Sequence, residues 1–279
     1  MMGPGDGKWA LCGNDEVTVM TEVVSALVPV TLDGNVLTVR MQRPEKRNAL
    51  NVEMYAALAT ALRRANSDPA VRVVVITGGP DCFTAGNDIL DFVGNPPADD
   101  THPVMQFLFA LTDFEKPLIA AVNGAAVGIG TTLLLHCDLA YAAEDARFHL
   151  PFVNLGLCPE AGSSLLLPMR AGSHRAAEAI LLGQPFDAAT ALSWGLVNRL
   201  TAPGQADAAA LEAAQRVAKQ PPAAIRAARQ LLREPLRLPL HDALRREAEA
   251  FVARLSSPEA AESFQAFMER RPPDFSPFS

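Results

Sequence analysis

The most informative segment of the chain is Leu118 to Cys137, which reads LIAAVNGAAVGIGTTLLLHC. It contains no Asp, Glu, Lys or Arg and has about the length of a membrane helix. Asn123-Gly124 is a turn signal, however, and further glycines interrupt the segment after it. We therefore expect no membrane span, but a short buried strand at 118–122, a tight loop, and a buried helix from about Ile129.

Strands and helices alternate on either side of this segment. VLTVRM (36–41) and RVVVIT (72–77) have the patterns of strands, and DLAYAA (138–143) follows the segment as another. Between the first two of these strands we expect a helix capped by Asn51. A second helix is expected over 104–115, before the strand at 118–122. This alternation predicts an α/β layered core.

Three regions differ in character. Residues 1–22 show no sustained periodicity and are expected to form a disordered tail, with Met20 as an alternative start. Residues 23–200 are expected to form the α/β core. Ala-rich and Arg-rich segments with helical spacing predict an all-helical region over 201–279. The joints between its helices are expected at Pro221, Pro235, Pro239 and Pro258.

The composition narrows the class of protein. The 279 residues are 49% hydrophobic and carry a net charge of −7, the wrong sign for a protein that coats nucleic acid. The four cysteines form no Cys-x-x-Cys pair, which in a chain of this length predicts a reduced, cytoplasmic protein. The histidines lack metal-ligand spacing, and phosphate-loop, zinc-protease and nucleophile-elbow motifs are absent. We expect no metal site.

Two glycine-containing loops follow predicted strands. FTAGNDI (83–89) comes after the strand at 72–77, and NGAAVGIG (123–130) after the strand at 118–122. Small residues let a ligand approach the backbone, and free N–H groups bind anions. Two such loops on neighbouring strands can direct two N–H groups at one oxygen, as an oxyanion hole requires.

Together with their flanks, these loops resemble a known family. RPEKRNALN (43–51), FTAGNDI, KPLIAAVNGAAVGIG and SFQAFMERRPPDF are similar to motifs of the crotonase, or enoyl-CoA hydratase/isomerase, superfamily, and the resemblance extends over Val30 to Phe275. It implies a crotonase-like α/β spiral of ββα units with a C-terminal all-helical trimerisation region. It also implies that acyl-CoA thioesters bind with their carbonyl oxygen on the N–H groups of Ala85 and Ile129.

The two glutamates of the family's hydratases are missing. The resemblance places them at Thr132 and Phe152. A carboxylate stands instead at Glu160, within FHLPFVNLGLCPEAGSS, which is similar to the peroxisomal-type Δ3,Δ2-enoyl-CoA isomerases, whose catalytic glutamate occupies this place. A double-bond shift needs one base, because the proton removed from C2 can be returned to C4 by the same group. Without the resemblance, Glu160 is better explained as an anion before a helix over 163–169.

The resemblance therefore implies an enzyme that converts 3-enoyl-CoA to 2-trans-enoyl-CoA in fatty-acid β-oxidation. A hydratase, another acyl-CoA reaction of this family, and a non-catalytic acyl-CoA-binding module remain alternatives. Coenzyme A is part of the substrate, and we expect no separate cofactor. The expected assembly is a homotrimer or a dimer of trimers. Further contacts with the acyl-CoA are expected from Lys46, Arg47, Asn48, Ala49, Phe83, Gly86, Asn87, Asp88, Ile89, Gly128, Phe152, Leu157, Phe267 and Arg270.

Overall fold

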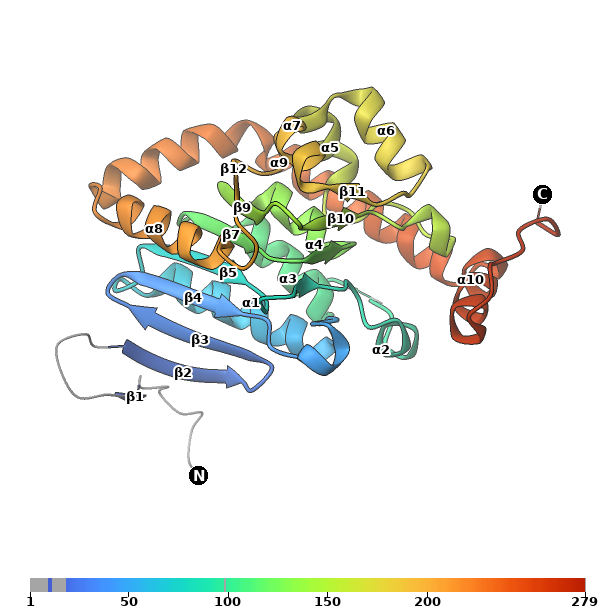
Figure 1. Cartoon of the computed structure of the whole chain (residues 1–279), viewed down its shortest axis with the longest axis horizontal. Coiled ribbons are helices and arrows are strands. Elements are labelled where there is room, and N and C mark those ends of the chain that lie inside the picture. Colours follow the sequence, from blue (N-terminus) through green and yellow to red (C-terminus); the bar gives the residue numbers. More distant parts are fainter. Residues whose placement is uncertain (1–9, 12–18, 98, 279) are drawn as a thin grey trace.

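Two β-sheets with surrounding helices make up the described residues, 10–11, 19–97 and 99–278, of the computed structural model (Figure 1). The larger sheet of this part of the chain has the strand order β1 (Ala10–Leu11), β2 (Val19–Ser25), β3 (Val28–Asp33), β4 (Val36–Arg40), β5 (Val73–Thr77), β7 (Leu118–Val122), β9 (Leu139–Ala143), β12 (Arg199–Thr201). The smaller sheet has the order β11 (Phe186–Asp187), β10 (Arg147–His149), β8 (Ala125–Val127), β6 (Cys82–Thr84).

From β5 to β10, successive strands alternate between the two sheets. β5, β7 and β9 lie side by side and parallel in the larger sheet. Each is followed in the chain by a strand of the smaller sheet, β6, β8 or β10, and these are also parallel to one another. This confirms the spiral of ββα units, and a C-terminal helical region follows it as expected.

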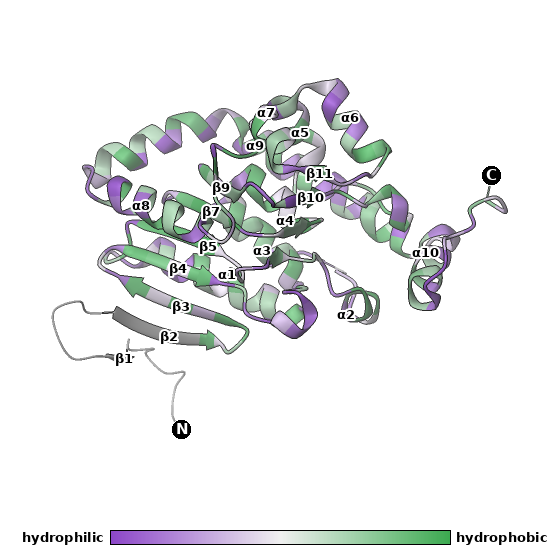
Figure 2. Ribbon diagram, in the orientation of Figure 1, coloured by the Kyte–Doolittle hydropathy of each residue, from purple (hydrophilic) through white to green (hydrophobic). Residues whose placement is uncertain are grey.

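Helices cover both faces of the larger sheet, which explains why every residue of β5 and β7 is buried. The helices α1 (Val52–Ser67) and α3 (Pro103–Thr112) pack on one face, and α8 (Ala206–Ala218) packs on the other. The hydropathy colouring of Figure 2 shows the apolar strands between these layers. Asn51 caps α1 as predicted, because its side chain accepts the N–H of Met54 at 2.9 Å.

The remaining helical elements connect or extend this core. They are η1 (Pro44–Lys46), α2 (Ile89–Gly94), α4 (Ile129–Thr132), η2 (Leu133–His136), η3 (Val153–Leu155), α5 (Ser163–Ala171), α6 (Ser173–Leu181), α7 (Ala188–Ser193), α9 (Pro222–Leu255) and α10 (Pro258–Glu269). α10 extends from the end of α9 at the right of Figure 1.

Two of the expected helix joints are wrong. α9 runs through Pro235 and Pro239 without a break, whereas Pro221 and Pro258 do stand at helix boundaries. A proline inside a helix removes one N–H donor and leaves the carbonyl four residues earlier unpaired. For Pro235 that carbonyl belongs to Leu231, whose side chain is 77% exposed, so solvent can reach this side of α9.

The segment at 118–137 also differs in part from the prediction. Its expected strand is β7, but the expected loop contains β8, and the helix from Ile129 spans only four residues before the 3-10 helix η2. β8 escaped prediction because it is defined by its pairing with β6 and β10, which lie far away in the sequence. In the described part of the chain, no helix has both the length and the apolar character needed to cross a bilayer.

Part of the expected N-terminal tail lies outside the described residues, namely 1–9 and 12–18. The larger sheet already includes β2 from Val19, because β2 pairs with β3 in an antiparallel arrangement from Val19 to Ser25. The paired strand therefore begins within the segment that the sequence pattern assigns to the tail.

Candidate active site

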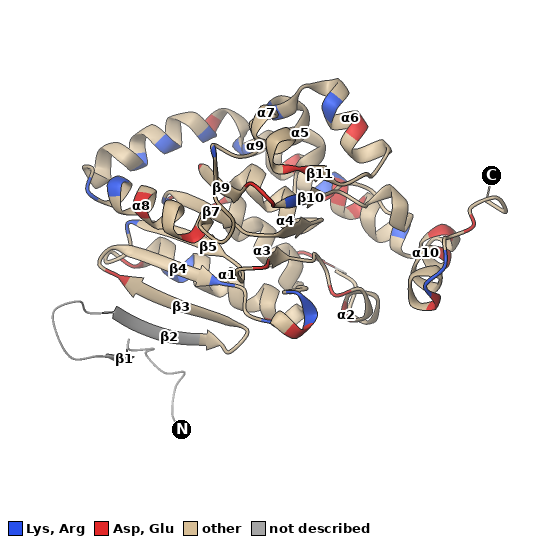
Figure 3. Ribbon diagram, in the orientation of Figure 1, with Lys and Arg blue, Asp and Glu red and all other residues tan. Residues whose placement is uncertain are grey.

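A mostly apolar cavity lies between α2, α3, α9 and the segment that carries Glu160. Its lining residues are Asn87, Phe92, Pro97, Val104, Met105, Leu108, Glu160, Ala161, Leu244, Glu247, Ala248 and Phe251. Two of them are carboxylates, whereas most charged residues of the molecule lie on outer helices and loops (Figure 3). An apolar cavity with a few polar groups is typical of a small-molecule site.

The carboxyl of Glu160, in this cavity, has a strongly shifted pKa. Burial among apolar groups, and to a lesser extent the negative charge of Glu247, raise the pKa of its carboxyl to about 8. The hydroxyl of Thr132 opposes this shift, because it donates a hydrogen bond of 2.7 Å to Oε1 of Glu160. A carboxyl with such a pKa can accept and return a proton near neutral pH.

Thr132, which stands where the resemblance places one of the hydratase glutamates, is a hydrogen-bond partner of Glu160. Thr132 is fully buried in α4, and its side chain fixes one oxygen of the Glu160 carboxyl. Phe152, at the other hydratase position, is 5% exposed and packs in the hydrophobic core. Neither residue supplies an acid or a base.

The two glycine-containing loops pack directly against each other. A Cβ atom at Gly86 would lie 2.9 Å from the carbonyl oxygen of Val127, and one at Gly130 would lie 2.5 Å from Cγ2 of Thr84. Glycine is therefore required at both positions for the loops to approach each other. The proximity expected from the sequence is confirmed.

The N–H groups offered by these loops differ from the prediction at one residue. The N–H of Ala85 donates to the carbonyl of Arg47 at 3.0 Å, so it is not available to a ligand. Among the described residues, the N–H groups of Asn87 and Ile129 have no partner. Asn87 is the loop residue that lines the cavity. Of the two expected donors, the N–H of Ala85 is thus occupied within the fold and that of Ile129 is free, and Asn87 offers a second free N–H in the same loop.

Backbone pairing explains this correction. Leu50 donates to the carbonyl of Gly86 at 2.8 Å and accepts the N–H of Asp88 at 2.9 Å. In such a parallel bridge the residue between the two partners, Asn87, directs its own N–H to the opposite side. The sequence pattern of the loop does not contain this long-range pairing.

The residues expected at the coenzyme A end have mainly structural contacts. Asn48 is 2% exposed, accepts the N–H of Arg43 at 2.8 Å and donates to the carbonyl of Cys82 at 2.9 Å. Arg47 and Asn48 both have a positive φ, which places them in a tight turn after η1. Asp88 forms an ion pair of 2.8 Å with Arg43. The side chains of Asn48 and Asp88 therefore hold the loop and are not free to contact a ligand.

The other residues predicted to contact the acyl-CoA do not line this cavity. Phe83 is fully buried in the core and does not line the cavity. Gly128 donates its N–H to His149 at 2.8 Å, and Ile89 begins α2. Leu157 packs partly buried against the core. The residues that remain, Lys46 and Ala49, flank the turn at Arg47 and Asn48 but line no part of the cavity.

Phe267 and Arg270 lie at the end of α10, away from the cavity of their own chain. Phe267 is 63% exposed. Their predicted contact with the coenzyme A of a neighbouring subunit stays a prediction.

Three aromatic residues in the cavity wall or directly behind it are not predicted from the sequence: Phe92 and Phe251 line the cavity, and Tyr55 contacts its lining residue Asn87. Tyr55 on α1 is 1% exposed, and its hydroxyl donates to Oδ1 of Asn87. Burial and the nearby Glu160 raise the pKa of Tyr55 well above its usual value. Phe92 and Phe251 contact each other edge to face with ring centroids 5.7 Å apart. In the sequence, the helical spacing of Tyr55, Phe92 and Phe251 predicts only that they lie on a buried helix face, not that they surround a site.

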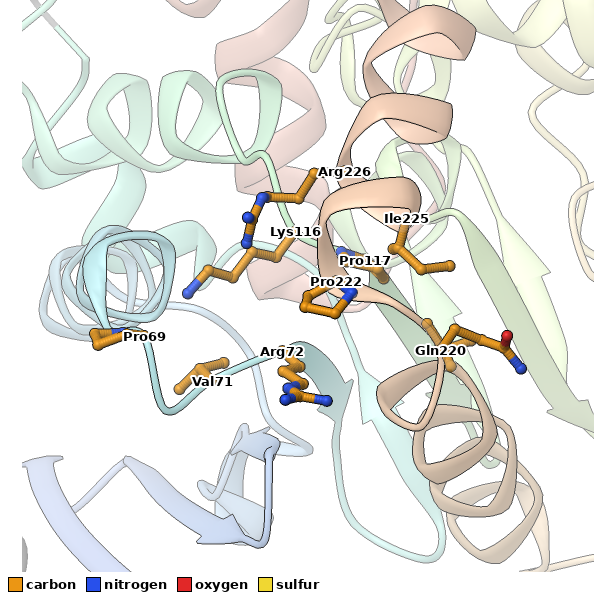
Figure 4. Close-up of a pocket in the computed structure, with 10 residues that line it drawn as sticks. Pro69, Val71, Arg72, Lys116, Pro117, Gln220, Pro222, Ile225 and Arg226 are labelled. Carbon is orange, nitrogen blue, oxygen red and sulfur yellow. The ribbon is translucent and has the colours of Figure 1, made fainter.

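A second cavity lacks comparable chemistry (Figure 4). Its lining includes Arg72, Lys116 and Arg226 but no carboxylate. Lys116 donates to the carbonyls of Ala65 at 2.6 Å and Asp68 at 2.5 Å, and its ammonium points toward Pro69 in Figure 4. Arg72 donates to a backbone carbonyl at 2.9 Å. Two of the three cations are thus already paired within the fold.

Comparisons with known proteins agree with the fold. A family model described as enoyl-CoA hydratase/isomerase matches residues 31–277. Enoyl-CoA delta isomerase 2 of Rattus norvegicus is 35% identical over 249 residues, which cover 87% of this chain but 63% of that protein. This chain thus spans less than two thirds of the rat protein.

Two further proteins match over nearly their whole length. The 2,3-dehydroadipyl-CoA hydratase of Escherichia coli K12 is 36% identical over 88% of this chain and 97% of its own. The crystal structure of an enoyl-CoA hydratase/isomerase from Pseudoalteromonas atlantica T6c superimposes with a TM-score of 0.86 at 42% identity, over 90% of this chain and 100% of that one. The names of these proteins include both isomerase and hydratase.

Proposed function

The chain belongs to the enoyl-CoA hydratase/isomerase family, and on this basis we propose that it converts 3-enoyl-CoA to 2-trans-enoyl-CoA with Glu160 as its single acid–base group. The observation that carries the proposal is the state of Glu160. Its carboxyl lies in an apolar cavity with a pKa of about 8, while Thr132 and Phe152 occupy the two hydratase positions.

The proposed reaction starts with proton removal. The Glu160 carboxylate takes a proton from C2 of the 3-enoyl thioester, and the C–H electron pair moves into a dienolate whose negative charge lies on the thioester oxygen. The N–H groups of Asn87 and Ile129 stabilise that oxygen, since they have no partner within the described chain. Because these two N–H dipoles are already fixed in place, the surroundings need little reorganisation when negative charge develops on the thioester oxygen.

The second step returns the same proton. The thioester carbonyl re-forms, the enolate π electrons move to make a C2–C3 double bond, and the former C3–C4 π electrons take the proton from the Glu160 carboxylic acid at C4, which restores the carboxylate. The raised pKa suits both steps, because a weakly acidic carboxyl is a better base and still donates to a carbanion. Apolar lining from Phe92, Leu108 and Phe251 excludes water, which would otherwise exchange with that proton.

Glu160 has to be ionised to act as the base. We expect kcat/KM to rise with pH and to level off above about 8, where the carboxylate predominates in the free protein. Thr132→Val removes the hydroxyl that favours the carboxylate, so the pKa of Glu160 rises and the plateau moves to higher pH. Rates measured over a pH series for both proteins test this. A rising limb at the same pH in the variant would contradict the role of Thr132.

Hydration is the second candidate, because a hydratase is among the relatives and Glu247 is a second carboxylate in the cavity. Both oxygens of Glu247 already accept backbone N–H groups, however, those of Gly162 and Ser164. A water molecule at Glu247 would have to share these oxygens with the backbone, and both bonds lower the basicity of the carboxylate toward water.

A direct comparison of substrates tests the proposal. The purified chain is incubated with cis- and trans-3-enoyl-CoA and with 2-enoyl-CoA of several acyl lengths, and products are separated by chromatography. We expect isomerisation to exceed hydration by about 10²-fold or more, the contribution of one acid–base group. Faster hydration would favour the hydratase, and acyl-CoA binding without turnover would favour a binding module.

Other parts of the assignment stay predictions. They are the place in fatty-acid β-oxidation, the absence of a separate cofactor, the homotrimer or dimer of trimers, and the cytoplasmic location. The proposed chemistry uses only side chains and backbone of the described residues and the thioester of the substrate.

A further inference from the structure

The turn that carries Glu160 has an unfavourable backbone conformation. Ala161 follows Glu160 with φ of 57°, a left-handed value that a residue with a Cβ atom rarely adopts, and Gly162 continues the turn with φ of 72°. Such a conformation persists only where surrounding contacts impose it. Ala161 also lines the cavity, so the turn and the candidate site are one structure.

Several groups fix this turn, and one of them comes from the C-terminal region. Locally, the hydroxyl of Ser163 donates to the carbonyl of Glu160 at 2.6 Å. On the side of η2, Nε2 of the buried His136 contacts the carbonyl of Ala161 at 2.7 Å. From α9, the carboxylate of Glu247 accepts the N–H of Gly162 at 2.5 Å through Oε2. Its other oxygen, Oε1, accepts the N–H of Ser164 at 2.8 Å.

Glu247 thus acts as a side-chain cap for α5 from another part of the chain. Gly162 is the N-cap of α5 and offers no side-chain cap, so the N–H groups of Gly162 and Ser164 depend on Glu247, whereas that of Ser163 donates to the carbonyl of Glu160. Glu247 is 7% exposed, and its two acceptor oxygens are both occupied. A buried carboxylate with charge-assisted bonds to two N–H groups fixes their position strongly.

We propose that Glu247 is a positioning residue for the reaction: by holding the N–H groups of Gly162 and Ser164, it fixes the turn that aims the Glu160 carboxyl into the cavity. The inference rests on the isomerase chemistry proposed above. It means that the helical region over 201–279 completes the active site of its own chain and is not only a surface for assembly.

Glu247 also acts on the charge of Glu160. Both carboxylates line the cavity, and the charge of Glu247 raises the pKa of Glu160. The other titratable or charged groups that face this pair are Tyr55 from α1, Cys158 from the preceding loop and Arg246 from α9. Loss of Glu247 removes a negative charge next to Glu160, which lowers the pKa of Glu160 and favours its carboxylate.

The test uses Glu247→Gln, because glutamine has nearly the same shape but only one acceptor oxygen and no charge. We expect kcat for 3-enoyl-CoA to fall by about 10²-fold, the effect of a misplaced catalytic group, with little change in KM. The rising limb of the pH profile should move to lower pH. Glu249→Gln changes an exposed glutamate of the same helix and should behave like the natural protein.

Two further measurements keep the outcome decisive. Glu247→Asp retains the charge but is too short to hold both N–H groups, so we expect a loss of about 10-fold in kcat with a smaller shift of the pH profile. Circular dichroism and binding of a saturated acyl-CoA establish that each variant is folded. Equal helicity and equal binding together with the kcat loss support the proposal.

Other outcomes overturn it. A Glu247→Gln protein with natural kcat and pH profile shows that the contact is not needed, and a kcat loss that accompanies lost binding or helicity shows a purely structural role. Glu160→Gln is measured in the same assay. If it retains turnover, the proposed isomerase mechanism itself fails, whereas an inactive Glu160→Gln with a natural Glu247→Gln refutes only the inference about Glu247.

Discussion

Glu160→Gln should lower kcat for isomerisation by about 10⁴-fold, the upper end of what one acid–base group contributes. The same carboxyl removes the proton from C2 and returns it to C4, so both chemical steps lose their catalyst. Glutamine has almost the same volume and can still accept the hydrogen bond from Thr132, which keeps the cavity intact. The rate of formation of conjugated 2-enoyl thioester, followed by its ultraviolet absorbance, measures the loss.

The matched control is again Glu249→Gln, which removes an exposed glutamate without contacts to the cavity. Its kcat should equal that of the natural protein. Turnover by Glu160→Gln within a few-fold of the natural rate would remove Glu160 from the mechanism. It would also reopen the alternative that Glu160 only precedes a helix.

The same substitution should stabilise the fold at alkaline pH. The pKa of Glu160 is about 8 in the folded chain, against a usual value of 4.5. The folded state therefore holds its proton more tightly, and folding loses free energy as the pH rises from about 4.5 to 8. Because glutamine does not titrate, Glu160→Gln should unfold with a free energy higher by on the order of 5 kcal/mol at pH 9. Urea unfolding at pH 5 and pH 9 separates this from any difference that does not depend on pH.

The second large effect concerns the oxyanion. Ile129→Pro removes one of the two free N–H groups, and we expect kcat to fall by about 10²- to 10³-fold, as for other single oxyanion donors. Ile129 is the first residue of α4, a position at which a helix tolerates proline because that N–H has no partner in the helix. The loss should appear in kcat more than in KM, since the charge on the oxygen develops in the transition state.

Ile129→Ala is the control for this substitution. It removes most of the same buried side chain, which is 1% exposed, but keeps the N–H group. We expect Ile129→Ala to retain kcat within about 10-fold while Ile129→Pro does not. Equal activity of the two variants would show that the Ile129 N–H does not stabilise the reaction, and the thioester oxygen would then need another donor.

Local patterns in the chain were sufficient for much of the fold. The β-branched run of β5 and the apolar run of β7 predict buried parallel strands, because both faces of such strands are covered. The cap at Asn51 was found because its side chain bonds only three residues away. α9 shows the limit of this approach, since Pro235 and Pro239 lie inside a helix that the rest of the fold maintains.

The candidate site shows the same division between local and long-range information. Glu160 and the absence of carboxylates at Thr132 and Phe152 can be recognised in the sequence, because residue identity alone defines which groups can carry a proton. That Ala85 is occupied and Asn87 is free follows from pairing with Arg47 and Leu50, residues more than thirty positions away. Backbone hydrogen bonds of this kind leave no pattern in a single sequence.

The sequence alone thus established the family resemblance, the α/β core and the chemical identity of the one candidate base. The raised pKa of Glu160 and the contact of its turn with Glu247 arise only when α9, η2 and the loop after β10 come together in space. The physical reason is that desolvation and hydrogen bonding depend on which groups surround a side chain, and distant parts of the chain supply those groups.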